Sequence, residues 1–436
     1  MKNNLTTTNQ NAKLALSKSK SLLDITNSLL ANRRSKELTQ SLENFRFSPS
    51  IKHGGGVESV VISPDGKYIV SGGMDKTIKL LKINNGNWLR IFKGHSHWVR
   101  TVAITHDGKY IVSGSNDKTI KLWEISSGKC LRTFEGHDSY VESVAIIPDG
   151  KYIVSGSSDG TIKLWEINSG KELRTFRGHS VVVNSVAITP DGKYIVSAGA
   201  YDNAIILWEI SSGKKLRIFE GHSDGVHSVA ISSDGKYIAS GGSDITIKLW
   251  EIGSGKQVRT FKGHNKFLNS LAISADGKYI VSGYGADGEA SGIIEQLEIN
   301  SSKEVQTLRG HKLLVFSVAI TPDGKYIVSG SLDSTIKLWE ISSGKLLSSY
   351  VAYENEWLSW TPDGYYNCSN GAYKYFSFVD DSKEMQEIVP QDHPVYKAKK
   401  KEILLSDYIG GANPYAKNSP HTDMPEIDID DDEIPF

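Results

Sequence analysis

Residues 140–146 read Tyr140-Val-Glu-Ser-Val-Ala-Ile146, and a second strand-like run, Thr161-Ile-Lys-Leu-Trp165, follows the turn signal Pro148-Asp-Gly150. The first run alternates polar and apolar residues, which indicates a β-strand with one buried face. Residues 152–155 and 172–176 read as two further strands, because they are rich in β-branched and aromatic residues. Together these segments predict four short antiparallel strands joined by turns.

This unit recurs along the chain. An Asp-Gly-Lys-Tyr sequence places its glycine at Gly66, Gly108, Gly150, Gly192, Gly235, Gly277 and Gly324. The steps are 42, 42, 42, 43, 42 and 47 residues, and a period of this length indicates a propeller or solenoid rather than separate domains. One four-stranded sheet cannot bury both of its faces alone, whereas radial stacking buries them. The repeats therefore predict an all-β fold, a β-propeller.

Two motifs mark the repeats. Gly-His pairs begin six of them, at His95, His137, His179, His222, His264 and His311, and Trp-Glu pairs end the third strand of five, at Trp123, Trp165, Trp208, Trp250 and Trp339. The chain resembles the WD-repeat family in these motifs, with Trp-Glu in place of the usual Trp-Asp, over about three quarters of its length. The resemblance implies a WD-repeat β-propeller whose upper face binds proteins.

The recurring histidines call for comparison with a catalytic triad. In one repeat they give the set His137, Ser155, Asp159 and Trp165, and the family resemblance implies that these four side chains form a buried hydrogen-bond relay. No enzyme needs a separate triad in every repeat. The sequence also has no nucleophile elbow, phosphate loop or metal-ligand spacing. We therefore expect a protein that is not an enzyme and that holds no metal or cofactor.

The number of blades is open to two interpretations. Seven repeats begin at the positions of His53, His95, His137, His179, His222, His264 and His311. Residues 356–364 then repeat the first strand and turn, and 365–368 and 373–379 are plausible second and third strands. Because an open ring leaves bare sheet edges, we favour eight blades, with residues 44–51 supplying the last outer strand. The alternative is seven blades, with residues 346–351 as the last outer strand and the eighth unit outside the ring.

Positions that vary between near-identical repeats are free of the constraints of the shared fold. In WD-repeat proteins these positions surround the channel on the upper face, and several carry large side chains here. The predicted partner-binding residues are Trp98, Arg100, Tyr140, Glu142, Tyr201, His227, Phe267, Leu314, Phe316 and Leu332. Exposed apolar side chains in loops mark interaction sites; the alternative is drift among redundant repeats without a ligand.

The ends of the chain differ from the repeats. Residues 1–43 form an N-terminal segment with an amphipathic helical pattern, which either docks on another protein or lies across the propeller. Residues 44–380 form the propeller, and 381–410 are an extension with a basic run. Residues 411–436 are rich in Pro, Ser, Asn and acids, which predicts a disordered tail.

The tail ends in a distinctive tip, made of Asp430, Asp431, Asp432, Glu433, Ile434, Pro435 and Phe436. It resembles the C-terminal tip of bacterial single-stranded DNA-binding proteins, an acidic run followed by Ile-Pro-Phe. The resemblance implies that genome-maintenance enzymes bind the tip, with the Phe ring in an apolar pocket and the acids on a basic rim. The alternative is a plain acidic solubility tail.

Composition limits the functional class. The 50 Lys+Arg balance the 50 Asp+Glu, but residues 423–433 hold seven acids and no base, which leaves a mildly basic body. No run approaches the roughly 20 apolar residues of a membrane helix, and the N-terminus lacks a signal-peptide core. With two cysteines far apart, a disulfide framework is not expected. We therefore expect a cytoplasmic protein that does not bind membranes.

Two functions fit these observations. The first is a protein-interaction scaffold whose upper face binds one protein and whose tip binds enzymes that recognise single-stranded DNA-binding protein. The second is a sensor or regulatory WD-repeat subunit of a bacterial defence or signalling system, which docks a separate effector through the N-terminal helix. Residues 360–366 are similar to segments that close bacterial WD-repeat proteins. Direct nucleic-acid binding by the propeller is not expected, because charges within the repeats are mixed.

Overall fold

The computed structural model describes residues 45–49, 55–83, 86–262, 267–285, 292–301, 303–353, 356–362, 366–369, 376–380 and 387–388. The predicted N-terminal helix, the basic run and the acidic tail lie outside the described residues. The chain divides into two compact units. One comprises residues 1–51 and 373–400, and the other, which holds the repeats, comprises residues 52–372 and 401–436.

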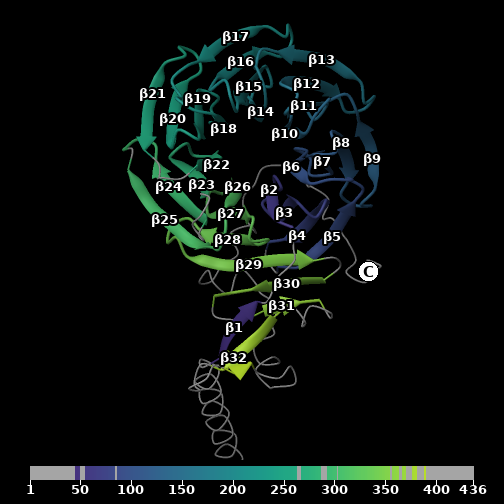
Figure 1. The fold of residues 1–436 in the computed structure, drawn as a ribbon, viewed down its shortest axis with the longest axis vertical. Coiled ribbons are helices and arrows are strands. Elements are labelled where there is room, and N and C mark those ends of the chain that lie inside the picture. Colours follow the sequence, from purple (N-terminus) through teal and green to yellow (C-terminus); the bar gives the residue numbers. More distant parts are fainter. Residues whose placement is uncertain are drawn as a thin grey trace, which may run out of the picture. The chain divides into compact units, whose positions relative to one another are not determined.

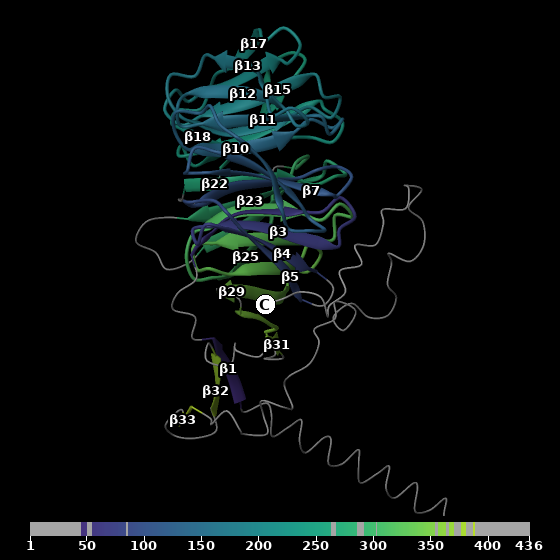
Figure 2. The same cartoon turned by 90° about the vertical axis from the view of Figure 1, so that its right-hand side faces the viewer.

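The repeats form seven antiparallel blades around a ring (Figures 1 and 2). Blade one contains β2 (Val57–Ile62), β3 (Tyr68–Gly73), β4 (Thr77–Lys82) and β5 (Trp88–Lys93). Blade two contains β6 (Val99–Ile104), β7 (Tyr110–Ser115), β8 (Ile120–Glu124) and β9 (Cys130–Phe134). Blade three contains β10 (Val141–Ile146), β11 (Tyr152–Ser157), β12 (Thr161–Glu166) and β13 (Glu172–Arg177). Blade four contains β14 (Val183–Ile188), β15 (Tyr194–Gly199), β16 (Ile205–Glu209) and β17 (Lys215–Phe219).

The other three blades follow the same order, with the first strand at the centre and the fourth at the circumference (Figure 1). Blade five contains β18 (Val226–Ile231), β19 (Tyr237–Gly242), β20 (Thr246–Glu251) and β21 (Gln257–Lys262). Blade six contains β22 (Phe267–Ile273), β23 (Tyr279–Gly285), β24 (Gly292–Glu298) and β25 (Glu304–His311). Blade seven contains β26 (Val315–Ile320), β27 (Tyr326–Ser331), β28 (Ile336–Glu340) and β29 (Leu346–Tyr353), with β30 (Glu356–Trp360) and β31 (Tyr366–Cys368) added to its outer edge.

Six seams pack a glycine in the second strand of one blade against an aliphatic side chain in the first strand of the next. At the seam between blades four and five, Ala198 takes the place of the glycine and packs with Val226. A Cβ atom on Gly156 would lie 2.7 Å from Val183 Cγ1, so only glycine permits this approach. Buried apolar side chains from both blades fill the rest of each seam. Val112 and Phe134 of blade two, for example, share a core with Val141 of blade three.

A hydrogen bond joins the first strands across every seam. The backbone N–H of one blade donates to a Ser or Thr hydroxyl of the blade before it, at 3.0–3.3 Å. The pairs are Val102 with Ser59, Val144 with Thr101, Val186 with Ser143, Val229 with Ser185, Leu271 with Ser228, Val318 with Ser270, and Val60 with Ser317.

The bond from Val60 to Ser317 closes the ring between blades seven and one, as does the approach of Val57 to Gly330. The preference for eight blades was therefore wrong, and the alternative of seven is correct. The physical reason lies in the linkers. Residues 135–140 separate β9 from β10 and carry the chain from the circumference to the centre, whereas only residues 354–355 separate β29 from β30. So short a connection forms a hairpin, which places β30 on the free edge of β29.

The hairpin β30–β31 reinforces the closing seam. At the other seams a long side chain in the outer strand reaches the third turn of the next blade; Arg174 Nη1, for example, donates to Ser212 O at 2.6 Å. Equivalent bonds come from Arg90, Arg132, Arg217, Arg259 and Gln306. Blade seven has Ser348 at this position, and its hydroxyl donates to Trp360 O in β30. Asn367 Nδ2 then donates to Asn87 Oδ1 of blade one at 2.9 Å.

The strand expected at residues 44–51 does not complete an eighth blade, because β30 and β31 belong to the sheet of blade seven. It forms β1 (Phe45–Pro49), which pairs with β32 (Phe376–Asp380), the run expected as a third strand of the eighth unit. β33 (Glu387–Ile388) completes this three-stranded sheet. Within the described residues, no helix is long and apolar enough to span a membrane.

A double-mutant cycle tests the closing seam. Gly330→Ala should lower the free energy of unfolding by about 1–3 kcal/mol, because the new methyl group overpacks against Val57. Val57→Ala in the same chain should recover part of that loss by making room. Urea denaturation of the two single variants and the double variant measures the coupling. Strictly additive losses would show that residues 57 and 330 are not in contact.

Candidate functional site

Three positions vary between the repeats, those of Trp98, Arg100 and Asn116 in blade two. They come together at one end of each blade, which we call the upper face. It carries the residues before the first strand and the turn between the second and third strands. A backbone hydrogen bond joins them: in blade two Asn116 N donates to Trp98 O at 3.0 Å. The same bond joins residues 74 and 56, 158 and 140, 200 and 182, 243 and 225, and 332 and 314. Columns far apart in a repeat are thus neighbours on this face.

The second of these columns, that of Arg100, occupies a β-bulge in the first strand of every blade. In blade three Val141 pairs with Ser157 and Ser143 with Gly156, so Glu142 has no partner in the ladder. The same register shift falls at Glu58, Arg100, Asn184, His227, Asn269 and Phe316. A bulge redirects a side chain. The sequence carries a signal for it, because the buried residues Val141 and Val144 are three apart where strict alternation requires an even spacing.

Bulge side chains reach across the seams. Arg100 Nη1 donates to Glu58 Oε2 of blade one at 3.0 Å, and Arg100 Nε lies 3.2 Å from Glu142 Oε2 of blade three. Between blades four and five, Asn184 Nδ2 lies 3.0 Å from His227 Nδ1. The predicted selectors Arg100 and Glu142 are thus paired with each other.

Burial shapes the electrostatics of these groups. It raises the pKa of the Glu58 carboxyl, and the neighbouring Arg100 only partly opposes this effect. For Arg100, burial would lower the pKa, but Glu142 and Glu58 outweigh it and hold that pKa above its ordinary value. Burial also lowers the pKa of His227, which favours the neutral imidazole. The charged groups of this column therefore belong to blades one to three.

Four predicted aromatic residues stand on the upper face: Trp98 is 36% exposed, Tyr140 43%, Tyr201 74% and Phe267 47%. Three other predicted residues are half-buried and so less exposed than these rings: Leu314, Phe316 and Leu332. Leu332 lies against Gly56 of blade one. Sequence reasoning missed His97, whose ring stacks on Tyr140 with centroids 6.5 Å apart. Its position directly before Trp98, in the same variable loop, is the signal that could have identified it.

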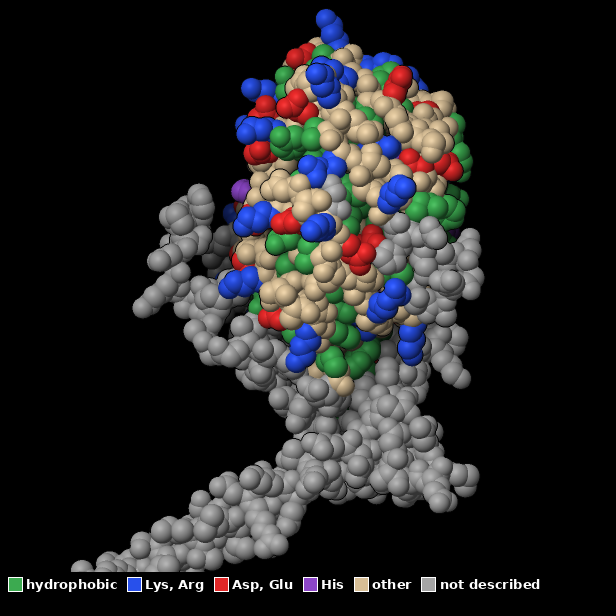
Figure 3. Space-filling view, turned by 90° about the vertical axis from the view of Figure 1, so that its left-hand side faces the viewer, with side chains coloured by type: hydrophobic (Ala, Val, Ile, Leu, Met, Phe, Trp, Pro, Cys, Tyr) green, Lys and Arg blue, Asp and Glu red, His purple; other side chains and the backbone are tan. Residues whose placement is uncertain are grey.

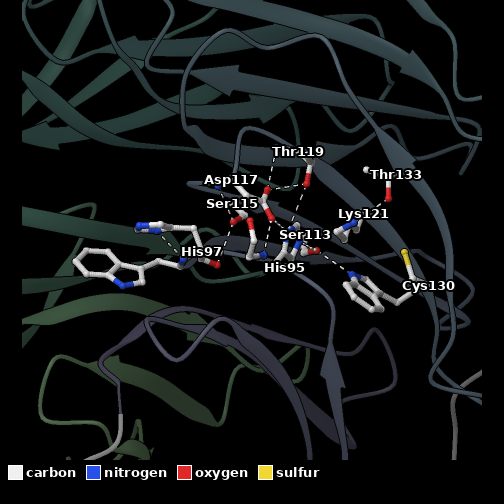
Figure 4. A network of polar contacts seen from close by, with 12 residues as sticks. His95, His97, Ser113, Ser115, Asp117, Thr119, Lys121, Cys130 and Thr133 are labelled. Carbon is white, nitrogen blue, oxygen red and sulfur yellow. Dashed lines mark hydrogen bonds and ion pairs between the residues drawn. The ribbon is translucent and has the colours of Figure 1, made fainter.

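The His-Ser-Asp-Trp sets form chains of hydrogen bonds (Figure 4). In blade two Trp123 Nε1 donates to Ser113 Oγ at 2.8 Å, and His95 lies 2.7 Å from both Ser113 Oγ and Asp117 Oδ2. The predicted set of His137, Ser155, Asp159 and Trp165 has the same bonds. So do the sets of His179, His222 and His311.

The protonation of the relay follows from its geometry. An ionised Asp only accepts hydrogen bonds, so the imidazole Nδ1–H donates to it, and the Ser hydroxyl donates to Nε2 while accepting from the indole. A neutral imidazole therefore completes every bond, and burial lowers the pKa of His311 accordingly. Ser113 and Ser155 are fully buried. These serines cannot reach a substrate, so the sets stabilise the blades and are not catalytic triads.

Two blades depart from the relay. Blade six has Leu297 at the Trp position, and Ser282 Oγ donates instead to the Tyr284 hydroxyl at 3.1 Å. Blade one has Leu81 at that position, and its Asp75 accepts from Thr77 and Lys79. His53 and His264 lie outside the described residues.

The side of the propeller drawn in Figure 3 carries Lys and Arg side chains interspersed with Asp and Glu. This mixture is typical of a solvated protein surface. Among the residues with described positions, no group of three or more His, Cys, Asp or Glu side chains is arranged to hold a metal ion.

Ser155→Ala tests the relay. It should lower the free energy of unfolding by about 1–3 kcal/mol, because Trp165 Nε1 and His137 Nε2 lose their buried partner. Ser71→Ala is the matched control: Ser71 is the equivalent serine of blade one, where Leu81 supplies no indole N–H. Chemical denaturation compares the two variants. Equal losses would contradict the role of the indole and imidazole bonds.

The relay also predicts an acid dependence. Burial alone would raise the pKa of Asp244, but the hydrogen bonds of His222 and Thr246 outweigh it and lower that pKa from 3.8 to about 2. The carboxyl therefore contributes stability that is complete above about pH 4 and is lost as the pH falls through 2. Asp244→Asn should be less stable than the natural chain at pH 7, and the gap should close between pH 4 and 2. Asp138→Asn, at an exposed carboxylate, controls for the charge; a gap independent of pH would refute the prediction.

Comparison with known proteins agrees with this geometry. The sequence profile of the WD domain, G-beta repeat, matches seven segments: residues 46–81, 86–124, 128–166, 170–209, 213–251, 255–291 and 302–340. A search of curated proteins finds no match to this chain. The segments cover more than half of the sequence, and each segment from 86–124 onward starts just before the outer strand of one blade. Each of these ends with the third strand of the next blade, except 255–291, which ends just before β24. The chain belongs to the WD40 repeat family, and its seven-bladed ring is a propeller of that family.

Proposed function

We propose that this propeller is a non-enzymatic protein-interaction scaffold whose upper face binds a protein partner. WD40 propellers are typically scaffolds of this kind. The observation that carries the proposal is the exposure of Trp98, Tyr140, Tyr201 and Phe267 on one face. Large aromatic side chains supply much of the binding energy of protein interfaces, and here they occupy the positions that the repeated framework leaves variable.

Several neighbouring side chains extend this face without aromatic rings. Val181 and Leu313 are exposed in the same loops of blades four and seven. Hydrogen bonds within each blade hold the loops of the upper face in place. The relay aspartates accept from backbone N–H groups of these loops; Asp117, for example, accepts from Ser96 N at 3.0 Å. A rigid apolar rim loses little conformational entropy on binding, which favours affinity.

The C-terminal tip is the second binding element of the proposal. Its terminal Phe ring offers a large apolar area, its α-carboxylate can pair bidentately with an Arg, and the acids before it raise the association rate with a basic partner. Support comes from the sequence of residues 430–436 and its resemblance to the tip of single-stranded DNA-binding proteins. The partners proposed for it are genome-maintenance enzymes that recognise that tip.

Affinity capture with three forms of the full-length chain tests both elements. Trp98→Ala with Phe267→Ala should remove the partner of the upper face, because about 1–3 kcal/mol or more is lost for each aromatic anchor. Deletion of Phe436 should instead remove helicases, nucleases or recombination mediators. Quantitative mass spectrometry of the captured proteins provides the measurement.

Leu131→Ala is a matched control for the first variant, since Leu131 is equally exposed but lies on the circumference in β9. A partner list unchanged by the double substitution would overturn the proposal for the upper face. A list unchanged by loss of Phe436 would overturn the proposal for the tip, and the two results are independent.

A further inference from the structure

The upper face is not uniform around the ring. Blades one to three carry the paired groups Glu58, Arg100 and Glu142 on their bulges, with two carboxylates facing one guanidinium. The formal charge of this cluster is −1. The bulges of blades four to six carry Asn184, His227 and Asn269, and the two asparagines donate to the backbone carbonyls of the next blade. Negative charge among the bulge residues is therefore concentrated on one sector.

Two acceptors in this sector lack donors. Glu58 is 8% exposed; its Oε2 accepts from Arg100, but its Oε1 is buried without a hydrogen bond among the described residues. Asn116 is also 8% exposed, and its Oδ1 is likewise buried without a donor. Burying an acceptor without a donor costs about 1–3 kcal/mol, more for a carboxylate. Arg100 Nε of the same cluster is a buried donor that forms no hydrogen bond among the described residues, although it lies 3.2 Å from Glu142 Oε2. The two oxygens would gain from a ligand that donates hydrogen bonds.

The position of Asn116 directs it toward the cluster. In blade three the equivalent Ser158 donates to the bulge residue Glu142 at 2.5 Å, and in blade five Ser243 lies 2.7 Å from the bulge residue His227. The side chain before the relay Asp thus lies beside the bulge residue of its own blade. In blade two that residue is Arg100, which itself joins Glu58.

Aromatic rings border the same sector. Trp98 is the hydrogen-bonded backbone neighbour of Asn116, and Tyr140 holds the equivalent position in blade three. His97 contacts both rings, with centroids 5.6 Å from Trp98 and 6.5 Å from Tyr140. The faces of Trp and Tyr attract cations, and their area accommodates the methylene groups of a long side chain.

We infer that the sector formed by Glu58, Asn116, Trp98 and Tyr140 binds a basic side chain of the partner protein. The inference rests on the proposed function of the upper face and names the chemistry of its ligand. The N–H groups of the ligand donate to Glu58 Oε1 and Asn116 Oδ1 after these two side chains turn outward, since both oxygens are inaccessible in the free chain. The stem of the ligand lies against the aromatic rings. Arginine fits better than lysine, because it offers more N–H donors and its plane stacks on aromatic rings.

Electrostatics supports this choice. Burial raises the pKa of Glu58, and Arg100 offsets this only in part. A cation of the ligand would oppose the effect of burial on the pKa of Glu58 together with Arg100. It would also bring the formal charge of the cluster from −1 to zero. An acidic ligand would meet two carboxylates, and a neutral one would leave the charge of Glu58 uncompensated.

A library of short peptides tests the inference on the full-length chain. Each peptide has Arg, Lys, Gln or Glu at its centre and mixed residues on both sides, and binding of the dye-labelled protein is measured. Peptides with central Arg should bind about tenfold or more tightly than those with Gln, the effect of a charge-assisted hydrogen bond. Glu58→Gln should reduce that preference to less than about threefold. Glu166→Gln, at a carboxylate in the third turn on the opposite face, should leave it unchanged.

Asn116→Ser is a second variant that keeps the test independent of any effect on folding, since Ser158 occupies the same position in blade three. It should lower the preference for Arg without changing the thermal midpoint. Equal binding of all four peptide classes, with loss on Trp98→Ala, would overturn the inference and leave the proposed function intact. No peptide binding, with a partner still captured through Trp98, would also overturn it. Absence of both would remove the proposed function as well.

Discussion

The close approach of first strands at the blade seams is the constraint on which the rest of the structure depends. A small residue, glycine in six blades and Ala198 in blade four, receives an aliphatic side chain. A Ser or Thr hydroxyl accepts from the next backbone N–H, as Ser317 does for Val60 beside the contact of Gly330 with Val57. Neither interaction tolerates a larger group, because the interior is close-packed. When a blade makes both interactions at each of its two seams, its orientation relative to the neighbouring blades is determined. Seven such blades close a ring, and no strand need be exchanged between the ends of the chain.

This constraint separates framework from function. The relays, seam glycines and hydroxyls leave little freedom to most positions of a repeat. The freedom that remains lies at the bulge, the residue two positions before it and the residue before the relay Asp. These positions are adjacent on the upper face, as the bond between Asn116 N and Trp98 O shows. The positions that vary between the repeats are therefore concentrated on the face where a partner protein can contact them.

The polar interior explains why the Ser, His and Asp residues of the relays do not form catalytic triads. Each relay serine is buried, accepts from an indole and donates to an imidazole, so its oxygen is neither exposed nor activated. The upper face differs, since Glu58 and Asn116 have buried acceptors that receive no hydrogen bond from the residues that the structure describes. Unsatisfied groups of this kind are uncommon in folded proteins and draw attention to a ligand.

The sequence by itself determined the four strands of each repeat and their turns, because alternation, turn residues and a period near 42 report local structure directly. The relay and the place of the variable positions on the upper face followed from the resemblance to WD-repeat proteins. It could not determine the number of blades. The run at 356–360 has the pattern of a first strand, but pattern specifies which residues face inward and not which strand lies alongside. Only the tertiary structure decided that this run pairs with β29 at the circumference, because the linker of residues 354–355 cannot reach the centre. The candidate site shows the same division. The variable residues could be identified from the sequence, whereas the pairing of Arg100 with Glu58 and Glu142 depends on the bulges and seams that bring side chains of three blades together.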